Sequence, residues 1–164
     1  MAKGDKLLKG KRILIVDDEP DVLETLEEYL SMCEIVKASR FDEAKELLEN
    51  IYFDMAILDI MGVDGYKLLE IANNKRVIAV MLTAHALSSD NILKSYKEGA
   101  ASYVPKDEML NITTFLSDIF EAKEDGKSFW WRWLDRLDSY FEKEFGADWK
   151  TKDKPFWDEF GYFM

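Results

Sequence analysis

The stretch Ile13-Leu14-Ile15-Val16-Asp17-Asp18 decides the fold, because an apolar run of strand length ends there in two carboxylates. The apolar run over residues 55–58 ends in the same way, at Asp59. Short runs that are apolar on both faces are typical of strands in a parallel sheet covered on both sides. Ligands of such sheets bind at the carboxyl ends of the strands, which is where these acids stand.

Three further apolar segments, at 35–38, 77–82 and 102–104, predict strands that alternate with amphipathic helical patterns. The helices are expected over about 20–30, 41–48, 66–72, 92–99 and 109–124. Five strand–helix units in alternation indicate an α/β fold with a doubly wound parallel sheet. Periodicity alone leaves the order of the strands in that sheet open.

The chain of 164 residues has a net charge of −11, and acids outnumber bases by 25 to 15 within residues 1–126. This balance offers no basic stripe for a phosphate backbone, so we expect no nucleic-acid partner. No apolar run approaches the roughly 20 residues of a membrane span, and no signal peptide is visible, so we expect no membrane association. The single Cys33 excludes an internal disulfide and indicates a cytoplasmic location.

The polar residues at the strand ends form a chemically coherent set. Asp17, Asp18 and Asp59 would repel one another without a cation, and Mg²⁺ takes oxygen ligands of this kind. Thr83 and Lys106 follow the fourth and fifth predicted strands, at the same edge of the sheet. A hydroxyl and an ammonium can neutralise a phosphoryl group, and an aspartate can accept one as an acyl phosphate.

Six segments match, in order, those of the receiver domain of two-component response regulators, which the chain resembles over about residues 10–124. The segments are Ile13-Leu14-Ile15-Val16-Asp17-Asp18-Glu19-Pro20, Leu58-Asp59-Ile60-Met61, Asp64-Gly65, Leu82-Thr83-Ala84-His85-Ala86, Gly99-Ala100 and Tyr103-Val104-Pro105-Lys106. The resemblance implies a flavodoxin-like sheet of five strands in the order 2-1-3-4-5. It also implies a receiver domain over residues 10–126.

The resemblance assigns the phosphoacceptor and the metal ligands. Asp59 would accept the phosphoryl group from a histidine kinase or a histidine phosphotransfer protein. Asp18, Asp59 and the backbone carbonyl of Met61 would bind Mg²⁺ directly, and Asp17 would contribute largely through a water molecule. No other cofactor is implied.

The resemblance also implies a switch. Thr83 would contact a phosphoryl oxygen after transfer, Lys106 would pair with the phosphate, and Tyr103 would change rotamer as Thr83 moves. Such a protein signals through protein–protein contacts and is not an enzyme, except toward its own phosphorylation and dephosphorylation. A phosphatase of the haloacid dehalogenase type is disfavoured, because Met61 stands where that chemistry needs a second aspartate.

Two departures from the family pattern flank this site. The segment 59–65 is about two residues shorter than usual, so we expect an altered loop beside the metal ligands. Asp107 follows Lys106 where the family has proline. Because a cis bond before a residue other than proline costs about 2.5–4 kcal/mol, we expect a trans peptide there.

The composition changes at residue 127, and all five tryptophans lie beyond it. Residues 127–164 are therefore expected to form a Trp-rich helical C-terminal extension whose apolar stripe is covered. The stripe could fold back on the receiver, form a homodimer or dock another protein. Two other functions stay open, a phosphorelay intermediate and a degenerate receiver that acts as a scaffold.

Overall fold

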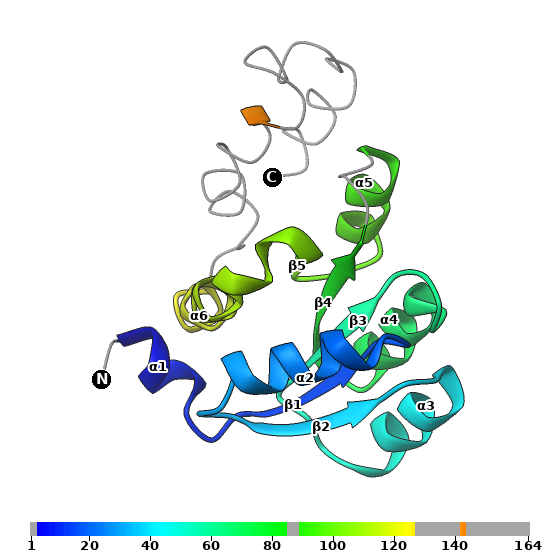
Figure 1. Cartoon of the computed structure of the whole chain (residues 1–164), viewed down its shortest axis with the longest axis horizontal. Helices are drawn as coiled ribbons and strands as arrows, with labels where there is room; N and C mark the ends of the chain where they lie inside the picture. Colours follow the sequence, from blue (N-terminus) through cyan, green and yellow to red (C-terminus); the bar gives the residue numbers. More distant parts are fainter. Residues whose placement is uncertain (1–2, 85–88, 127–141, 144–164) are drawn as a thin grey trace.

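The computed structural model describes residues 3–84, 89–126 and 142–143. Its centre is a five-stranded parallel sheet in the order β2-β1-β3-β4-β5 (Figure 1). The strands are β1 (Arg12–Val16), β2 (Glu34–Ala38), β3 (Met55–Asp59), β4 (Ile78–Thr83) and β5 (Ser102–Pro105). The predicted fold class, sheet and strand order are therefore confirmed.

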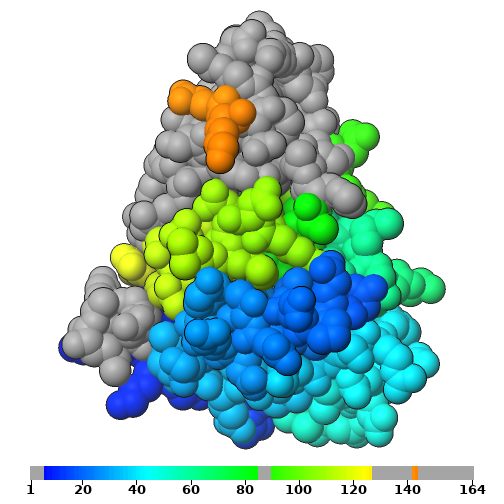
Figure 2. Space-filling model, viewed as in Figure 1, coloured from blue at the N-terminus to red at the C-terminus, as the bar shows by residue number. Residues whose placement is uncertain are grey.

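Helices connect the strands and cover both faces of the sheet (Figure 1). They are α1 (Lys3–Leu8), α2 (Pro20–Tyr29), α3 (Phe41–Asn50), α4 (Gly65–Asn74), α5 (Ser89–Lys97) and α6 (Ile112–Glu124). Helices α2 and α6 contact each other, as do α3 and α4. Figure 2 shows α2 beside the segment that runs from β5 into α6 on the face toward the viewer.

The core explains why these short segments form strands. Every residue of β3 and β5 is buried, and so are Ile13, Leu14, Ile15 and Val16 of β1. Burial of a Leu, Ile or Val side chain contributes about 1.5–3 kcal/mol, so a sheet covered on both faces is favoured over an exposed one. Because the strands are held in place by this core, the polar residues at their carboxyl ends lie together at one edge of the sheet.

Two elements differ from the sequence-based expectation. The short helix α1 was not predicted; it contacts α6, and its Leu8 is fully buried. The last predicted helix begins at Ile112 rather than Met109, because a 3-10 helix, η1 (Lys106–Asn111), comes first. This tight helix turns the chain directly after β5 and thereby places Lys106 at the edge of the sheet.

The predicted C-terminal extension, 127–164, lies outside the described residues except for positions 142 and 143. The expectations of a homodimer or a docking surface there stay predictions. Among the described residues, no helix has the length and apolar character needed to span a membrane.

Candidate functional site

Three of the predicted site residues meet at the carboxyl edge of the sheet. Asp17 directly follows β1, Asp59 ends β3, and Lys106 directly follows β5. The Nζ atom of Lys106 lies 2.9 Å from Oδ2 of Asp17 and 3.6 Å from Oδ1 of Asp59. Asp17 and Asp59 are 0% and 4% exposed, so this ion-pair cluster is shielded from water.

Glu19 is a member of the cluster that the sequence analysis did not assign. Its Oε1 accepts a hydrogen bond of 3.0 Å from Nζ of Lys106, although its side chain is largely exposed. Carboxylate oxygens of Asp17, Asp18 and Glu19 lie within 4.8 Å of one another. In the sequence, Glu19 is only the third consecutive acid before Pro20. Its partner is identified by the structure, in which the Lys106 side chain extends to it.

Burial and crowding of like charges control protonation here. Burial raises the pKa of Asp59 to about 6, and the Asp17 carboxylate adds to this increase while Lys106 opposes it. Burial also raises the pKa of Asp17, against the lowering effect of Lys106. Burial by itself would lower the pKa of Lys106, but its bonds to Asp17 and Glu19 outweigh burial and raise it. The cluster therefore has excess negative charge that one lysine does not balance.

The short loop between β3 and α4 closes with a γ-type turn. The N–H of Val63 donates a 2.9 Å hydrogen bond to the carbonyl of Met61, and Gly62 between them has a φ of +77°. A Cβ atom on Gly62 would lie 2.6 Å from Oδ2 of Asp18. The loop is thus pressed against a predicted metal ligand, and only glycine fits there.

Gly65 permits a second close approach. A Cβ at this position would lie 2.9 Å from the carbonyl carbon of Asp59 and would overlap the carbonyl oxygen. The N–H of Gly65 donates to the carbonyl of Ile60 at 3.2 Å, which ties the start of α4 to the end of β3. The backbone that follows Asp59 is therefore fixed from both sides.

The two predicted switch residues lie on adjacent strands. Thr83 ends β4, is 7% exposed, and pairs in register with Pro105, next to Lys106. Tyr103 is 1% exposed and pairs in register with Met81. The described residues contain no cis peptide, so the bond between Lys106 and Asp107 is trans, as expected.

A 2-1-3-4-5 parallel sheet with an acidic cluster and a half-buried lysine at its carboxyl edge defines a receiver-type signalling domain. The family model of the response regulator receiver domain matches residues 13–114, and the chain belongs to this family.

Similar proteins come from plants and bacteria. The chain is 39% identical over 110 residues to the two-component response regulator ARR18 of Arabidopsis thaliana, covering 63% of this chain and 17% of that protein. It is 34% identical over 89 residues to the response regulator GtcR of Aneurinibacillus migulanus, covering 51% and 37%. The chain thus spans well under half the length of these relatives.

Solved structures of similar fold include receiver domains from several microorganisms. The receiver domain protein of Methanospirillum hungatei JF-1 has a TM-score of 0.59 and 29% identity, covering 70% of this chain and 99% of that one. The activated receiver domain of RstA from Klebsiella pneumoniae has a TM-score of 0.53 and 31% identity, covering 58% and 85%.

Proposed function

We propose that this protein is a response regulator whose Asp59 accepts a phosphoryl group from a phosphorylated histidine of another protein. The observation that carries this proposal is the ammonium of Lys106, which Asp17 and Glu19 hold 3.6 Å from Oδ1 of Asp59, on a side chain that is 10% exposed. An ammonium so placed can neutralise the charge of an incoming phosphoryl group. In the transfer, an oxygen of Asp59 forms the new bond to phosphorus while the bond from phosphorus to the histidine nitrogen breaks.

The acidic cluster fits a divalent metal ion. Oδ2 of Asp17 is buried, and its one partner among the described residues is the Lys106 ammonium at 2.9 Å, which Asp59 and Glu19 share, so its charge is only partly satisfied. We assign Asp17, Asp18 and Asp59 as the residues that would hold Mg²⁺, with the backbone carbonyl of Met61. That carbonyl already accepts one hydrogen bond and keeps a second lone pair. Bound Mg²⁺ would supply further neutralisation of the phosphoryl oxygens.

Signalling would follow from a change in the groups beside the phosphate. Thr83 is the hydroxyl at the end of the strand next to Asp59, and we assign it the contact with a phosphoryl oxygen. Tyr103 lies on the adjoining strand, so a shift of Thr83 changes the packing around its ring. The outcome is a two-state switch whose populations phosphorylation shifts.

The proposed partners are a histidine kinase or histidine phosphotransfer protein as donor and a further protein as the target of the output. We propose a cytoplasmic location, which Cys33 supports because it is a free thiol. Residues 10–126 are proposed as the receiver and 127–164 as the extension that carries homodimer formation or other protein contacts.

The experiment that tests this function is treatment of the full chain with acetyl phosphate and Mg²⁺, followed by intact mass measurement and size-exclusion chromatography. We expect one phosphoryl adduct in the wild type and none in Asp59→Asn. No adduct in the wild type would contradict the proposal and favour the scaffold. Transfer of the adduct to a purified histidine phosphotransfer protein would instead identify a relay intermediate.

A further inference from the structure

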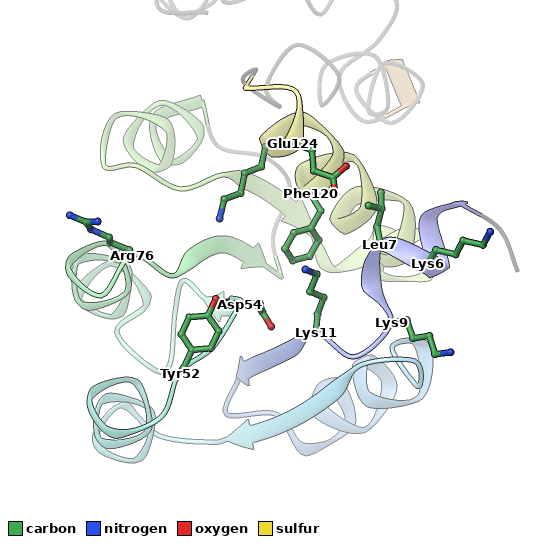
Figure 3. Close-up of a pocket in the computed structure, with 10 residues that line it drawn as sticks. Lys6, Leu7, Lys9, Lys11, Tyr52, Asp54, Arg76, Phe120 and Glu124 are labelled. Carbon is green, nitrogen blue, oxygen red and sulfur yellow. Dashed lines mark hydrogen bonds between the residues drawn. The ribbon is translucent and has the colours of Figure 1, made fainter.

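A cavity of about 530 Å³ lies at the end of the sheet opposite to Asp59. Its lining includes residues within two positions of the starts of β1, β3 and β4, with side chains of α1 and α6 (Figure 3). A five-residue strand spans roughly 15–17 Å, so this cavity is separate from the phosphoacceptor edge. Its volume is within the range of about 300–1,000 Å³ found for small-molecule sites.

Five cationic side chains line the cavity, although the chain as a whole has a net charge of −11. They are Lys6, Lys9, Lys11, Arg76 and Lys123. Within the part of the chain that the structure describes, none of the five forms an ion pair, whereas Arg12, Lys37, Lys45, Lys67 and Lys106 all do. Unpaired cations gathered around a hollow in an acidic protein favour an anionic occupant.

The cations are arranged at two depths. Lys11 points toward Phe120, with its Nζ 5.1 Å from the ring centroid, and Phe120 is 7% exposed (Figure 3). Lys6, Lys9 and Arg76 point outward in the same view, so they form the rim. An anionic group could therefore pass the rim cations and reach the ammonium of Lys11 above the apolar floor.

The cavity also presents an anchored aromatic ring. Tyr52 is 69% exposed, yet its hydroxyl donates a 3.1 Å hydrogen bond to Oδ1 of Asp54. The other oxygen of Asp54 accepts a 2.8 Å hydrogen bond from the backbone N–H of Arg12. Asp54 is thus occupied in orienting Tyr52, whose exposed ring lines the cavity together with the cationic side chains. Stacking on such a ring suits a flat heterocycle.

We propose that this cavity binds a mononucleotide with two or more phosphates. The phosphates contact Lys11 and Lys123, and the base stacks on Tyr52. Glu124 in the lining offers an acceptor for a ribose hydroxyl or for an amino group of the base. Inorganic phosphates have neither group, so this contact favours a nucleotide over them. The site does not depend on Asp59, so the proposed phosphoryl transfer and this binding can fail separately.

The test is calorimetric titration of the full chain with ATP in EDTA, where the acidic cluster holds no metal. We expect one saturable site whose affinity falls with added NaCl, and unchanged affinity in Asp59→Asn. Lys11→Gln and Lys123→Gln should each weaken binding about tenfold, since each removes a charge-assisted contact. Lys45→Gln, an exposed lysine on α3, is the matched control and should bind as the wild type does.

Further calorimetric titrations identify the class of ligand. Tyr52→Leu should weaken ATP binding about fivefold or more, while tripolyphosphate binding is unchanged by this substitution. Equal affinity for tripolyphosphate and ATP in the wild type would overturn the nucleotide assignment, as would much tighter binding of a short single-stranded RNA. No saturable binding at millimolar ATP, or full affinity in correctly folded Lys11→Gln and Lys123→Gln proteins, would overturn the site itself.

Discussion

Replacement of Asp59 by asparagine is expected to stabilise the protein in the absence of divalent cations. Burial and the Asp17 carboxylate raise the pKa of Asp59 from 3.8 to about 6, so the folded protein holds this proton more tightly than the unfolded chain does. The contribution of Asp59 to the free energy of unfolding is therefore most favourable below pH 4, falls as the pH rises from 3.8 to 6, and stays low above it. Because Asp59 is only 4% exposed, the full shift of about two pKa units applies, and it corresponds to at most about 3 kcal/mol.

The measurement is urea denaturation in EDTA at pH 4, 5, 6 and 7.5, followed by circular dichroism. Asp59→Asn should exceed the wild type by up to about 3 kcal/mol at pH 7.5, and the difference should shrink toward zero at pH 4. Mg²⁺ should reduce the difference at pH 7.5, because it offsets the repulsion that the substitution removes. Glu28→Gln, which changes an exposed carboxylate, is the control. A difference that is absent or independent of pH would refute the reasoning.

Two further variants probe the short loop and the lysine. Gly62→Ala should weaken Mg²⁺ binding about ten- to hundredfold by calorimetry, because its Cβ displaces the Asp18 carboxylate. Gly10→Ala has the same φ of +77° and open space around its Cβ, so equal Mg²⁺ affinities in the two variants would contradict this. Lys106→Gln should lose about 3 kcal/mol or more of stability in EDTA, since it leaves buried carboxylates unpaired. Lys37→Gln, at an exposed ion pair, should lose less than about 1 kcal/mol, and a loss as large as that of Lys106→Gln would refute the assignment.

The fold was predictable because burial on both faces of the sheet leaves a strong local pattern. The runs that end at Asp17 and Asp59 are apolar at every position, and they emerge as β1 and β3. The strand order could not be predicted from the local pattern, and only the family resemblance implied it. Helix α1 was not predicted, because six residues give little periodic pattern and its contacts are with α6, far away in the sequence.

The sequence predicted the site residues that end strands. It did not predict the residue whose role depends on a side-chain contact with a distant part of the chain. Asp17, Asp59 and Lys106 are brought together by the sheet itself. Glu19 was missed because its partner is 87 positions further along the chain. The count of residues after Asp59 predicted a short loop, but it could not show that Gly62 would lie against Asp18.

The central claim is that Asp59 itself forms an acyl phosphate. Borohydride reduces an aspartyl phosphate to homoserine, which marks the modified residue permanently. The full chain would be incubated with acetyl phosphate and Mg²⁺, reduced, digested and sequenced by mass spectrometry. The account predicts homoserine at position 59 and none in a sample without the phosphodonor. Homoserine at position 17 or 18 instead, or at no position in a chain that carries the phosphoryl mass, would contradict it.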